Sequence, residues 1–264
     1  MRFLLFPALC FFVLVLPHFA QTTELEIERR IIAVQVQKLR SADVETRRDA
    51  VYQLGLLRNA VASQAAANSL RDSSEIVRAE AARAVIHLAS ADAATALLPL
   101  LTDKSEFVRR ETAFALGRTY DKTAVDSLIK TLQTDKTASV RAAATIALGQ
   151  ISDERAIEPL SQILLAPKNK QNRVLDEFVR RSAAKSLGQI RNRKAVPTLI
   201  SALRDRENAD DIRREAARAL GVIADESAAE ALRENLNAED YYLAQIVAEA
   251  LENIRNSNLL NPLF

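Results

Sequence analysis

The sequence has little cysteine, histidine, glycine or tryptophan, and each shortage excludes a class of function. Its 264 residues include one Cys, two His, five Gly and no Trp. Cys10 lies in the apolar N-terminal run, so the rest of the chain has no thiol for a disulfide, a metal-thiolate site or a nucleophile. His87 is the only histidine after residue 20, and a lone His does not make the usual metal site. We therefore expect no metal, no cofactor and no catalytic residue.

Glycine content and charge exclude further classes. The five glycines are never clustered, so the chain has no phosphate loop, no Gly-rich nucleotide turn and no nucleophile elbow. The 36 basic and 34 acidic residues leave a net charge of only +2, which does not favour a nucleic-acid partner. Any electrostatic role must come from where the charges are placed.

The N-terminus has the three-part layout of a secretory signal peptide. Met1-Arg2 carries positive charge, Phe3 to Leu16 is an apolar run broken only by Pro7, and Pro17 to Ala20 form a cleavage region. We predict that residues 1–20 are a signal peptide, which would make the protein secreted or periplasmic. The alternative is an uncleaved membrane anchor, because residues 3–20 are near the shortest stretch that spans a bilayer. The absence of Cys and Met from residue 21 onward suits an oxidising compartment.

Beyond this leader, one helical motif recurs seven times, and its fullest copy is Val140 to Ile151. Its first residues stand at positions 46, 77, 108, 140, 179, 212 and 243, so the period is 31–33 residues apart from one step of 39. Such a period predicts stacked repeats, because no single unit can bury its apolar face alone. All glycines occupy one slot, eight residues after the Arg of the motif, where a helical Gly costs about 1 kcal/mol against Ala. We therefore predict close packing of the next repeat at Gly55, Gly117, Gly149, Gly188 and Gly221.

The chain divides by pattern into three parts. After the leader, residues 21–255 read as repeats that each contain a short first helix, a polar turn and the second, Val-Arg helix, with a long helix over 24–41 as the N-terminal cap. Residues 166–173 are a basic, Pro-initiated insertion that lengthens the fifth repeat and predicts a mobile loop. Residues 256–264 form an apolar C-terminal tail.

The signature Asp…Val-Arg-x-x-Ala-Ala-x-Ala-Leu-Gly-x-Ile resembles the HEAT-repeat family, in particular the short HEAT-like units of the phycobilisome lyases. The resemblance runs from about residue 25 to 255. It implies an all-α, right-handed α-solenoid of the armadillo/HEAT type with about seven helical pairs. It also implies a structural ladder in which an Asp of the turn within each repeat pairs with the Arg of the second helix. The matching residues, six positions apart, are Asp72 and Arg78, Asp103 and Arg109, and Asp135 and Arg141.

A second set of positions marks a candidate binding face. Residues one, five and nine positions after the ladder Arg share one side of each second helix, away from its apolar stripe. Second helices of such repeats usually line the concave side, so we predict a basic groove for an extended or acidic segment of a protein. The alternative is a solvated face whose charges are offset by Asp49, Glu80, Glu111 and Glu215. The candidate residues are Arg48, Tyr52, Arg83, His87, Arg110, Phe114, Arg118, Ile146, Arg181, Lys185, Arg214 and Arg218.

These patterns favour a non-catalytic, exported scaffold that binds another protein. Deoxyhypusine hydroxylase, a HEAT-like relative, carries iron on His-Glu pairs, and this sequence contains no such pair. Two alternatives stay open. One is a lyase-like or enzyme-accessory chaperone of the HEAT-like family, which predicts a pocket with clustered His, Tyr or Cys. The other is a structural component of the cell envelope, which predicts a retained N-terminal anchor.

Overall fold

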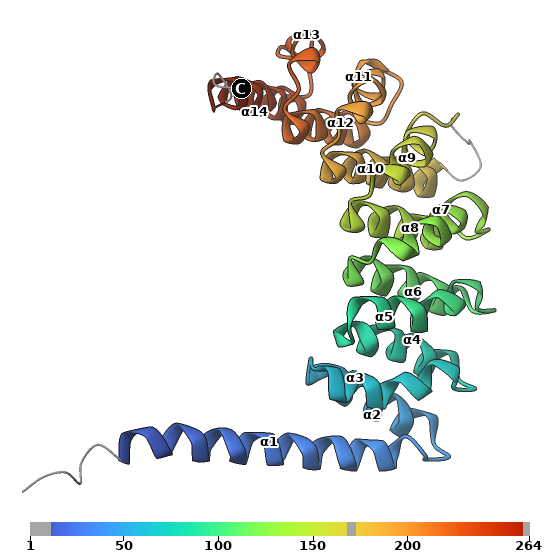
Figure 1. Cartoon of the computed structure of the whole chain (residues 1–264). Helices are drawn as coiled ribbons and strands as arrows, with labels where there is room; N and C mark the ends of the chain where they lie inside the picture. The colour runs from blue at the N-terminus through green and yellow to red at the C-terminus, as the bar shows by residue number, and fades with distance from the viewer. Residues whose placement is uncertain (1–11, 168–172, 261–264) are drawn as a thin grey trace, which may run out of the picture. The chain divides into compact units, whose positions relative to one another are not determined.

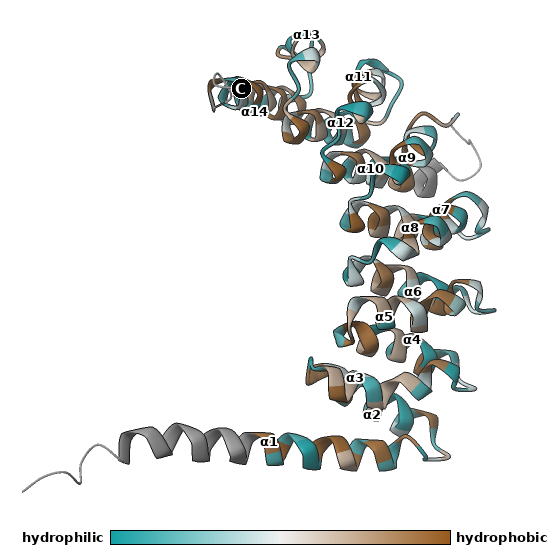
Figure 2. Ribbon diagram, viewed as in Figure 1, coloured by the Kyte–Doolittle hydropathy of each residue, from teal (hydrophilic) through white to brown (hydrophobic). Residues whose placement is uncertain are grey.

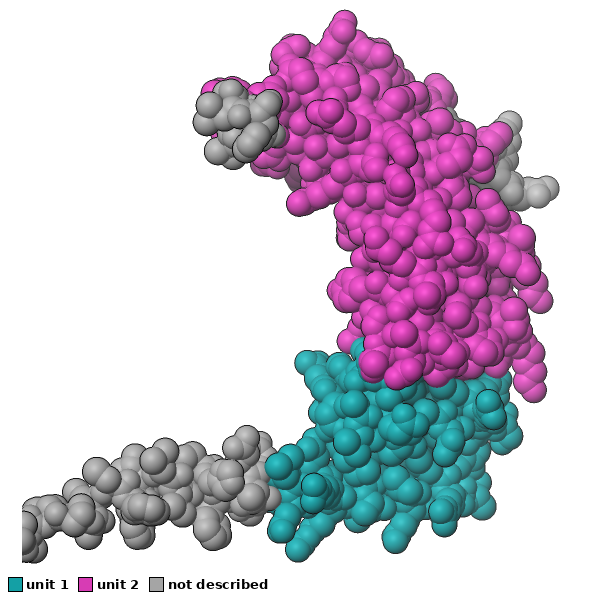
Figure 3. Space-filling view, viewed as in Figure 1, with its two compact units in different colours: residues 1–88 teal, residues 89–264 magenta. Residues whose placement is uncertain are grey.

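The computed structural model describes residues 12–167 and 173–260, with side chains described over 25–167 and 177–259. Every regular element in these ranges is an α-helix or a 3-10 helix. The chain separates into two compact units, residues 1–88 (unit 1) and 89–264 (unit 2) (Figure 3).

Unit 1 contains two helical pairs. Helix α1 packs against α2 and α3, and α2 packs against α4. Two polar side chains begin the short helices: Asp43 accepts a 2.8 Å hydrogen bond from the N–H of Thr46, and Asn59 accepts one of 2.8 Å from the N–H of Ala62. The elements are α1 (Phe12–Lys38), α2 (Val44–Leu56), α3 (Ala60–Ala66), η1 (Ala67–Arg71), α4 (Glu75–Ala84) and η2 (Val85–His87).

Unit 2 contains five further pairs. Within this unit α7, α9, α11 and α13 lie on the outer side of a curved stack, and α8, α10, α12 and α14 lie on its inner side (Figure 1). Helix α6 packs against α8, and α5 packs against α6. With the two pairs of unit 1, the described residues confirm the predicted α-solenoid of about seven pairs. The elements are α5 (Ser90–Leu97), η3 (Leu98–Thr102), α6 (Glu106–Thr119), η4 (Lys122–Ala124), α7 (Val125–Thr134), α8 (Ala138–Ile151), η5 (Glu154–Ala156), α9 (Ile157–Leu164), α10 (Arg173–Ile190), η6 (Arg193–Ala195), α11 (Val196–Arg204), α12 (Asp210–Ile223), η7 (Glu226–Ala228), α13 (Ala229–Arg233) and α14 (Tyr241–Leu260).

The apolar face of each second helix forms the core of its repeat. In α8, Val140, Ala144 and Leu148 are fully buried, as the 3.6-residue period of the motif requires. Apolar residues line the sides on which neighbouring helices meet (Figure 2). Burying one such Leu contributes about 1.5–3 kcal/mol, so the repeats are stable only as a stack.

The glycine slot lies where successive second helices meet. A Cβ added to Gly221 would lie 2.8 Å from the Cα of Ala250 in α14, and one added to Gly188 would lie 2.9 Å from the Cα of Ala219 in α12. Contacts this short are not found between real carbon atoms, which separate by about 3.5–4.0 Å. The missing side chain therefore allows these helix backbones to approach each other closely.

The second helices α6, α8 and α12 end in a left-handed residue that is not glycine. Tyr120, Ser152 and Ala224 have φ of 56°, 57° and 55°. Directly after each of them an Asp caps the 3-10 turn of the next repeat; Asp225, for example, accepts a 3.0 Å hydrogen bond from the N–H of Ser227. The turn between repeats is thus fixed by one strained residue and one cap.

The predicted insertion and the two ends are described in part. Residues 168–172 of the insertion, residues 1–11 of the leader and residues 261–264 of the tail lie outside the described residues. Helix α10 begins at Arg173, the last residue of the insertion, and has 18 residues against 14 in α8. Helix α14 continues to Leu260, so the first part of the tail is helical. Among the described residues, no helix combines the length and the apolar character that crossing a membrane requires.

Candidate functional site

The arginine ladder links neighbouring repeats. Arg109 donates through Nε and Nη2 to the carboxylate of Asp135, at 2.6 and 3.0 Å, across 26 residues of sequence. Its Nη1 donates to the backbone oxygen of Asp103 in its own turn, at 3.0 Å. Arg47 binds Asp72 of the next repeat in the same bidentate way, at 2.7 and 2.9 Å. The guanidinium groups of Arg47 and Arg109 thus donate both to backbone oxygens of the turn in their own repeat and to the Asp carboxylate in the turn of the next repeat.

This geometry corrects the expected pairing. The sequence spacing of six residues suggested that the Asp carboxylate of a repeat pairs with the Arg of that repeat. The own-turn contacts of Arg78, Arg109 and Arg141 instead go to backbone oxygens, those of Asp72, Asp103 and Asp135. The carboxylate of Asp135 accepts from the N–H of Thr137, at the start of the helix that follows, as well as from Arg109 of the preceding repeat. The ladder therefore orders the stack and not only the repeat.

Asparagine takes the place of aspartate in the C-terminal repeats. Arg180 donates to Asn208 Oδ1 at 2.7 Å, and Arg213 donates to Asn235 Oδ1 at 2.9 Å. Asn208 and Asn235 are buried, and their amide groups also donate to backbone oxygens. The sequence analysis missed both residues, although each stands in the turn that precedes a second helix.

Burial and hydrogen bonding act in opposite directions on the ladder carboxylates. For Asp135, burial alone would raise the pKa, but the hydrogen bonds from Arg109 and from the N–H of Thr137 outweigh it and hold the pKa below its ordinary value. For Asp72, the hydrogen bond from Arg47 is the main cause of a lowered pKa. Both carboxylates are therefore charged at neutral pH and serve structure.

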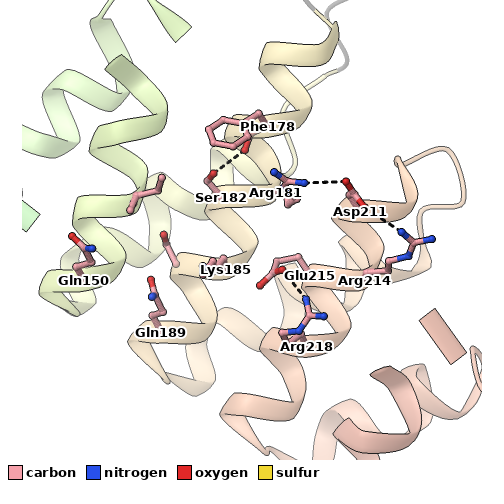
Figure 4. Close-up of a pocket in the computed structure, with 12 residues that line it drawn as sticks. Gln150, Phe178, Arg181, Ser182, Lys185, Gln189, Asp211, Arg214, Glu215 and Arg218 are labelled. Atoms are coloured by element: carbon pink, nitrogen blue, oxygen red, sulfur yellow. Dashed lines mark hydrogen bonds and ion pairs between the residues drawn. The ribbon is translucent and has the colours of Figure 1, made fainter. Parts of the chain in front are cut away.

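The inner side of unit 2 contains a hollow of about 500 Å³ over α8, α10 and α12 (Figure 4). The predicted residues Ile146, Arg181, Lys185, Arg214 and Arg218 all line it. They reach it because positions one and five after the ladder Arg project from the same side of successive helices. The other lining residues are Gln150, Phe178, Ser182, Ser186, Gln189, Asp211 and Glu215.

The arginines of the hollow are held in place by carboxylates. Arg181 pairs with Asp211 at 2.9 Å, Arg214 with Asp240 at 2.7 Å, and Arg218 with Glu215 at 2.8 Å. Arg181 and Arg214 also stack over the rings of Phe178 and Tyr242, each with its Cζ 5.3 Å from the ring centroid. Each of these arginines therefore has a carboxylate partner that offsets part of its charge.

Two cations of the predicted face differ from these arginines because they have no carboxylate partner in the part of the chain that the structure describes. Lys185 on α10 and Arg118 on α6 are exposed, and within the described residues neither makes an ion pair. Lys185 lines the hollow directly. Arg118 occupies the helix position equivalent to Gln150, whose side chain lies against Gly117 next to it. Four basic and two acidic side chains line the hollow, so its net charge is +2 (4 − 2).

The rest of the predicted face resembles the solvated alternative. In α6, Arg110 pairs with Glu111 at 3.0 Å, and Phe114 is half-buried. In unit 1, Arg48 pairs with Glu45 and Asp49, and Arg83 pairs with Glu80 at 3.1 Å.

Two further candidates of unit 1 differ in environment. The ring of Tyr52 is exposed. His87 lies in the 3-10 segment η2, because α4 ends at Ala84, so the four-residue spacing expected there is not kept.

Sequence reasoning missed Phe178 and Asp211. Each lies one helical turn before a predicted residue, three positions from Arg181 and Arg214 respectively. Extending the set of positions by one turn toward the helix N-terminus would have included both. Among the described residues, no three His, Cys, Asp or Glu side chains are grouped in a way that could hold a metal ion.

The chain is similar in fold to several solved structures. The complex of CpcE and CpcF of phycocyanin lyase from Nostoc sp. PCC7120 matches with 26% identity and a TM-score of 0.52, over 88% of this chain and 94% of that one. An engineered protein matches with 24% identity and a TM-score of 0.55, over 85% and 68%. YibA of Escherichia coli matches with 18% identity and a TM-score of 0.51, over 88% and 96%. No curated protein matches the sequence.

The family assignment rests on the repeats themselves. The model of HEAT repeats matches residues 32–117, 95–174 and 175–252, which include every second helix from α2 to most of α14. This agrees with the period, the helical pairs and the ladder described above. The chain belongs to the HEAT-repeat family.

Proposed function

We propose that this protein is a non-catalytic, exported scaffold that binds a segment of another protein on the inner side of its second helices. The observation that carries the proposal is the hollow over α8, α10 and α12, which collects predicted binding residues from three successive repeats. Half-buried Ile146 and exposed Phe178 offer apolar contacts there, and ordered arginines surround them. Exposed aromatic and arginine side chains of this kind dominate binding energy at protein interfaces.

The similarity to phycocyanin lyase adds support, since CpcE and CpcF form a complex with each other. An extended segment suits the surface, because each repeat presents the same helix positions and several weak contacts add up. A metal, a cofactor and a nucleic acid have no part in this function. Export through the signal peptide at residues 1–20 belongs to the same proposal.

Capture from an envelope extract tests the scaffold. The bait is the chain from Gln21 onward, the form that cleavage after Ala20 would leave. It is compared with a triple variant of the inner side, Arg118→Glu, Lys185→Glu and Arg218→Glu. The matched control, Lys104→Glu, Lys130→Glu and Lys136→Glu, changes the net charge equally in the α5–α6 turn, on α7 and in the turn after it. We expect a partner held by the wild type and by the control and lost by the first variant. A partner held equally by all three would contradict binding at the inner side.

The leader needs its own measurement. N-terminal sequencing of the protein recovered from the producing cells should begin at Gln21. Recovery of an intact Met1 from the membrane fraction would favour the anchored alternative, a structural component of the envelope.

A further inference from the structure

We infer that the inner side of unit 2 selects an extended peptide with two acidic side chains about five or six residues apart and an apolar residue between them. This inference rests on the proposed function and specifies the partner segment. It is carried by the contrast between the paired arginines of the hollow and the two cations, Lys185 and Arg118, that have no carboxylate partner in the described part of the chain.

The ion pairs decide which cations bind a partner. Arg181, Arg214 and Arg218 already donate hydrogen bonds to Asp211, Asp240 and Glu215. These carboxylates offset part of the attraction that each arginine would exert on an approaching peptide carboxylate. Lys185 and Arg118 have no such carboxylate beside them, so a peptide acid there meets the whole charge of the cation and can form a charge-assisted hydrogen bond with it. The acidic side chains of Asp211 and Glu215 reduce the net charge of the hollow to +2. The hollow therefore repels a basic peptide less strongly than four arginine and lysine side chains without these acids would.

The spacing follows from the stacking of the helices. Arg118 lies on α6, Lys185 lies on α10, and α8 packs between these helices. Neighbouring packed helices have axes about 8–10 Å apart, so two steps across the stack span about 16–20 Å. Arg118 also lies four helix positions further along than Lys185, about 6 Å at about 1.5 Å per residue, so the two cations are about 17–21 Å apart. An extended chain advances about 3.3–3.4 Å per residue. A peptide that crosses the stack therefore places its second acidic residue about five or six positions after the first.

The apolar residue of the peptide has a defined neighbour. Ile146 projects from α8, the helix between those that carry the two cations, and is half-buried in the wall of the hollow. Phe114 on α6 lies one turn before Arg118, and Phe178 on α10 is exposed at the other wall. A side chain placed midway between the two acids would contact Ile146 first.

The experiment selects peptides on the purified protein from a random library displayed on phage. Selected peptides are expected to carry the acidic pair at a spacing of five or six with an apolar residue between. A synthetic peptide of this pattern, measured by fluorescence anisotropy, should bind about tenfold more weakly to Arg118→Glu or Lys185→Glu and about a hundredfold more weakly to the double variant. The control Lys130→Glu, Lys136→Glu carries the same charge change on and beside α7 and should bind as the wild type does.

Three further arms make the result specific. Moving the two acidic residues of the synthetic peptide to adjacent positions should weaken its binding. A peptide with Lys in place of both acids should bind the double variant more tightly than the wild type. A single-stranded oligonucleotide should not compete with the acidic peptide. Equal unfolding curves for all variants establish that they fold alike. Peptides selected without an acidic pair would overturn this inference and leave the scaffold standing. No selected peptide, together with no captured partner, would overturn both.

Discussion

A single methyl group at the glycine slot of α12 should destabilise the protein, although alanine has a higher helix propensity than glycine. In Gly221→Ala the new Cβ would lie 2.8 Å from the Cα and 2.7 Å from the Cβ of Ala250. Alanine is normally the better residue inside a helix, by about 1 kcal/mol. The substitution therefore sets local propensity against the packing of neighbouring repeats.

The distances decide which effect is larger. Carbon atoms in contact are about 3.5–4.0 Å apart, so α12 and α14 would have to separate by about 0.7 Å or more. Overpacking of this kind costs about 1–3 kcal/mol, and the gain in helix propensity offsets about 1 kcal/mol of it. We expect Gly221→Ala to lose about 1 kcal/mol and to melt about 2–4 °C lower than the wild type.

Gly55 provides a matched control in the same slot of another repeat. A Cβ there would meet only Ala84, at 3.3 Å from its Cβ and 3.4 Å from its Cα, so the propensity term should dominate and Gly55→Ala should melt at or above the wild-type temperature. Thermal unfolding followed by circular dichroism at 222 nm, roughly the helical minimum, measures both variants. If Gly221→Ala melts higher and Gly55→Ala lower, the slot does not serve helix packing. Gly149→Leu extends the test, because its side chain would meet Ser186 and Gln189.

Three other predictions concern the ladder and the turns. Asp135→Ala should lower the free energy of unfolding in urea by about 2–3 kcal/mol, because it leaves the buried guanidinium of Arg109 without its carboxylate partner. As a control, Glu234→Ala removes the partner of exposed Arg204 and should lower the free energy of unfolding much less. Because folding lowers the pKa of Asp72, Asp135 and Asp240, their stabilisation is present above the unfolded pKa of about 4. It is lost as pH falls through the lower folded values, and an Asp135→Ala protein should lose less stability over that range. Ala224→Gly should raise the melting temperature, because Ala224 has a φ of 55° that glycine adopts without strain; a lowered temperature would contradict this account of the turn.

Much of the fold follows from the sequence because its signals are local and repeated. The residues of α8 show the 3.6-residue period, the small residues and the glycine within one helix, and the same pattern at a fixed period predicts that helices of neighbouring repeats meet. The ladder was predicted only in part. Spacing along the chain shows that Asp103 and Arg109 are near each other, but it does not show which oxygen the guanidinium reaches. Whether Arg109 binds the carboxylate of its own turn or that of Asp135 depends on the stacking distance, which a repeat sequence does not contain.

The candidate face shows the same limit more strongly. The positions of Arg181, Lys185 and Arg218 on one side of their helices could be deduced from helical spacing, and all three line the hollow. Their partners could not be deduced equally well. Glu215, three residues before Arg218, is a neighbour that helix geometry allows. Asp211 is 30 residues away from Arg181 in sequence and reaches it only because α12 packs on α10.

Charge pairing, rather than the number of basic residues, therefore decides what the inner side can recognise. A count of arginines along the second helices suggests an extended basic groove that would attract any polyanion. The structure neutralises most of them, through Glu80, Glu111, Asp211, Glu215 and Asp240. What is left is a small number of separated cations on a rigid stack, and separated charges at fixed distances discriminate between partners by the spacing of their acids, which a uniformly basic surface does not.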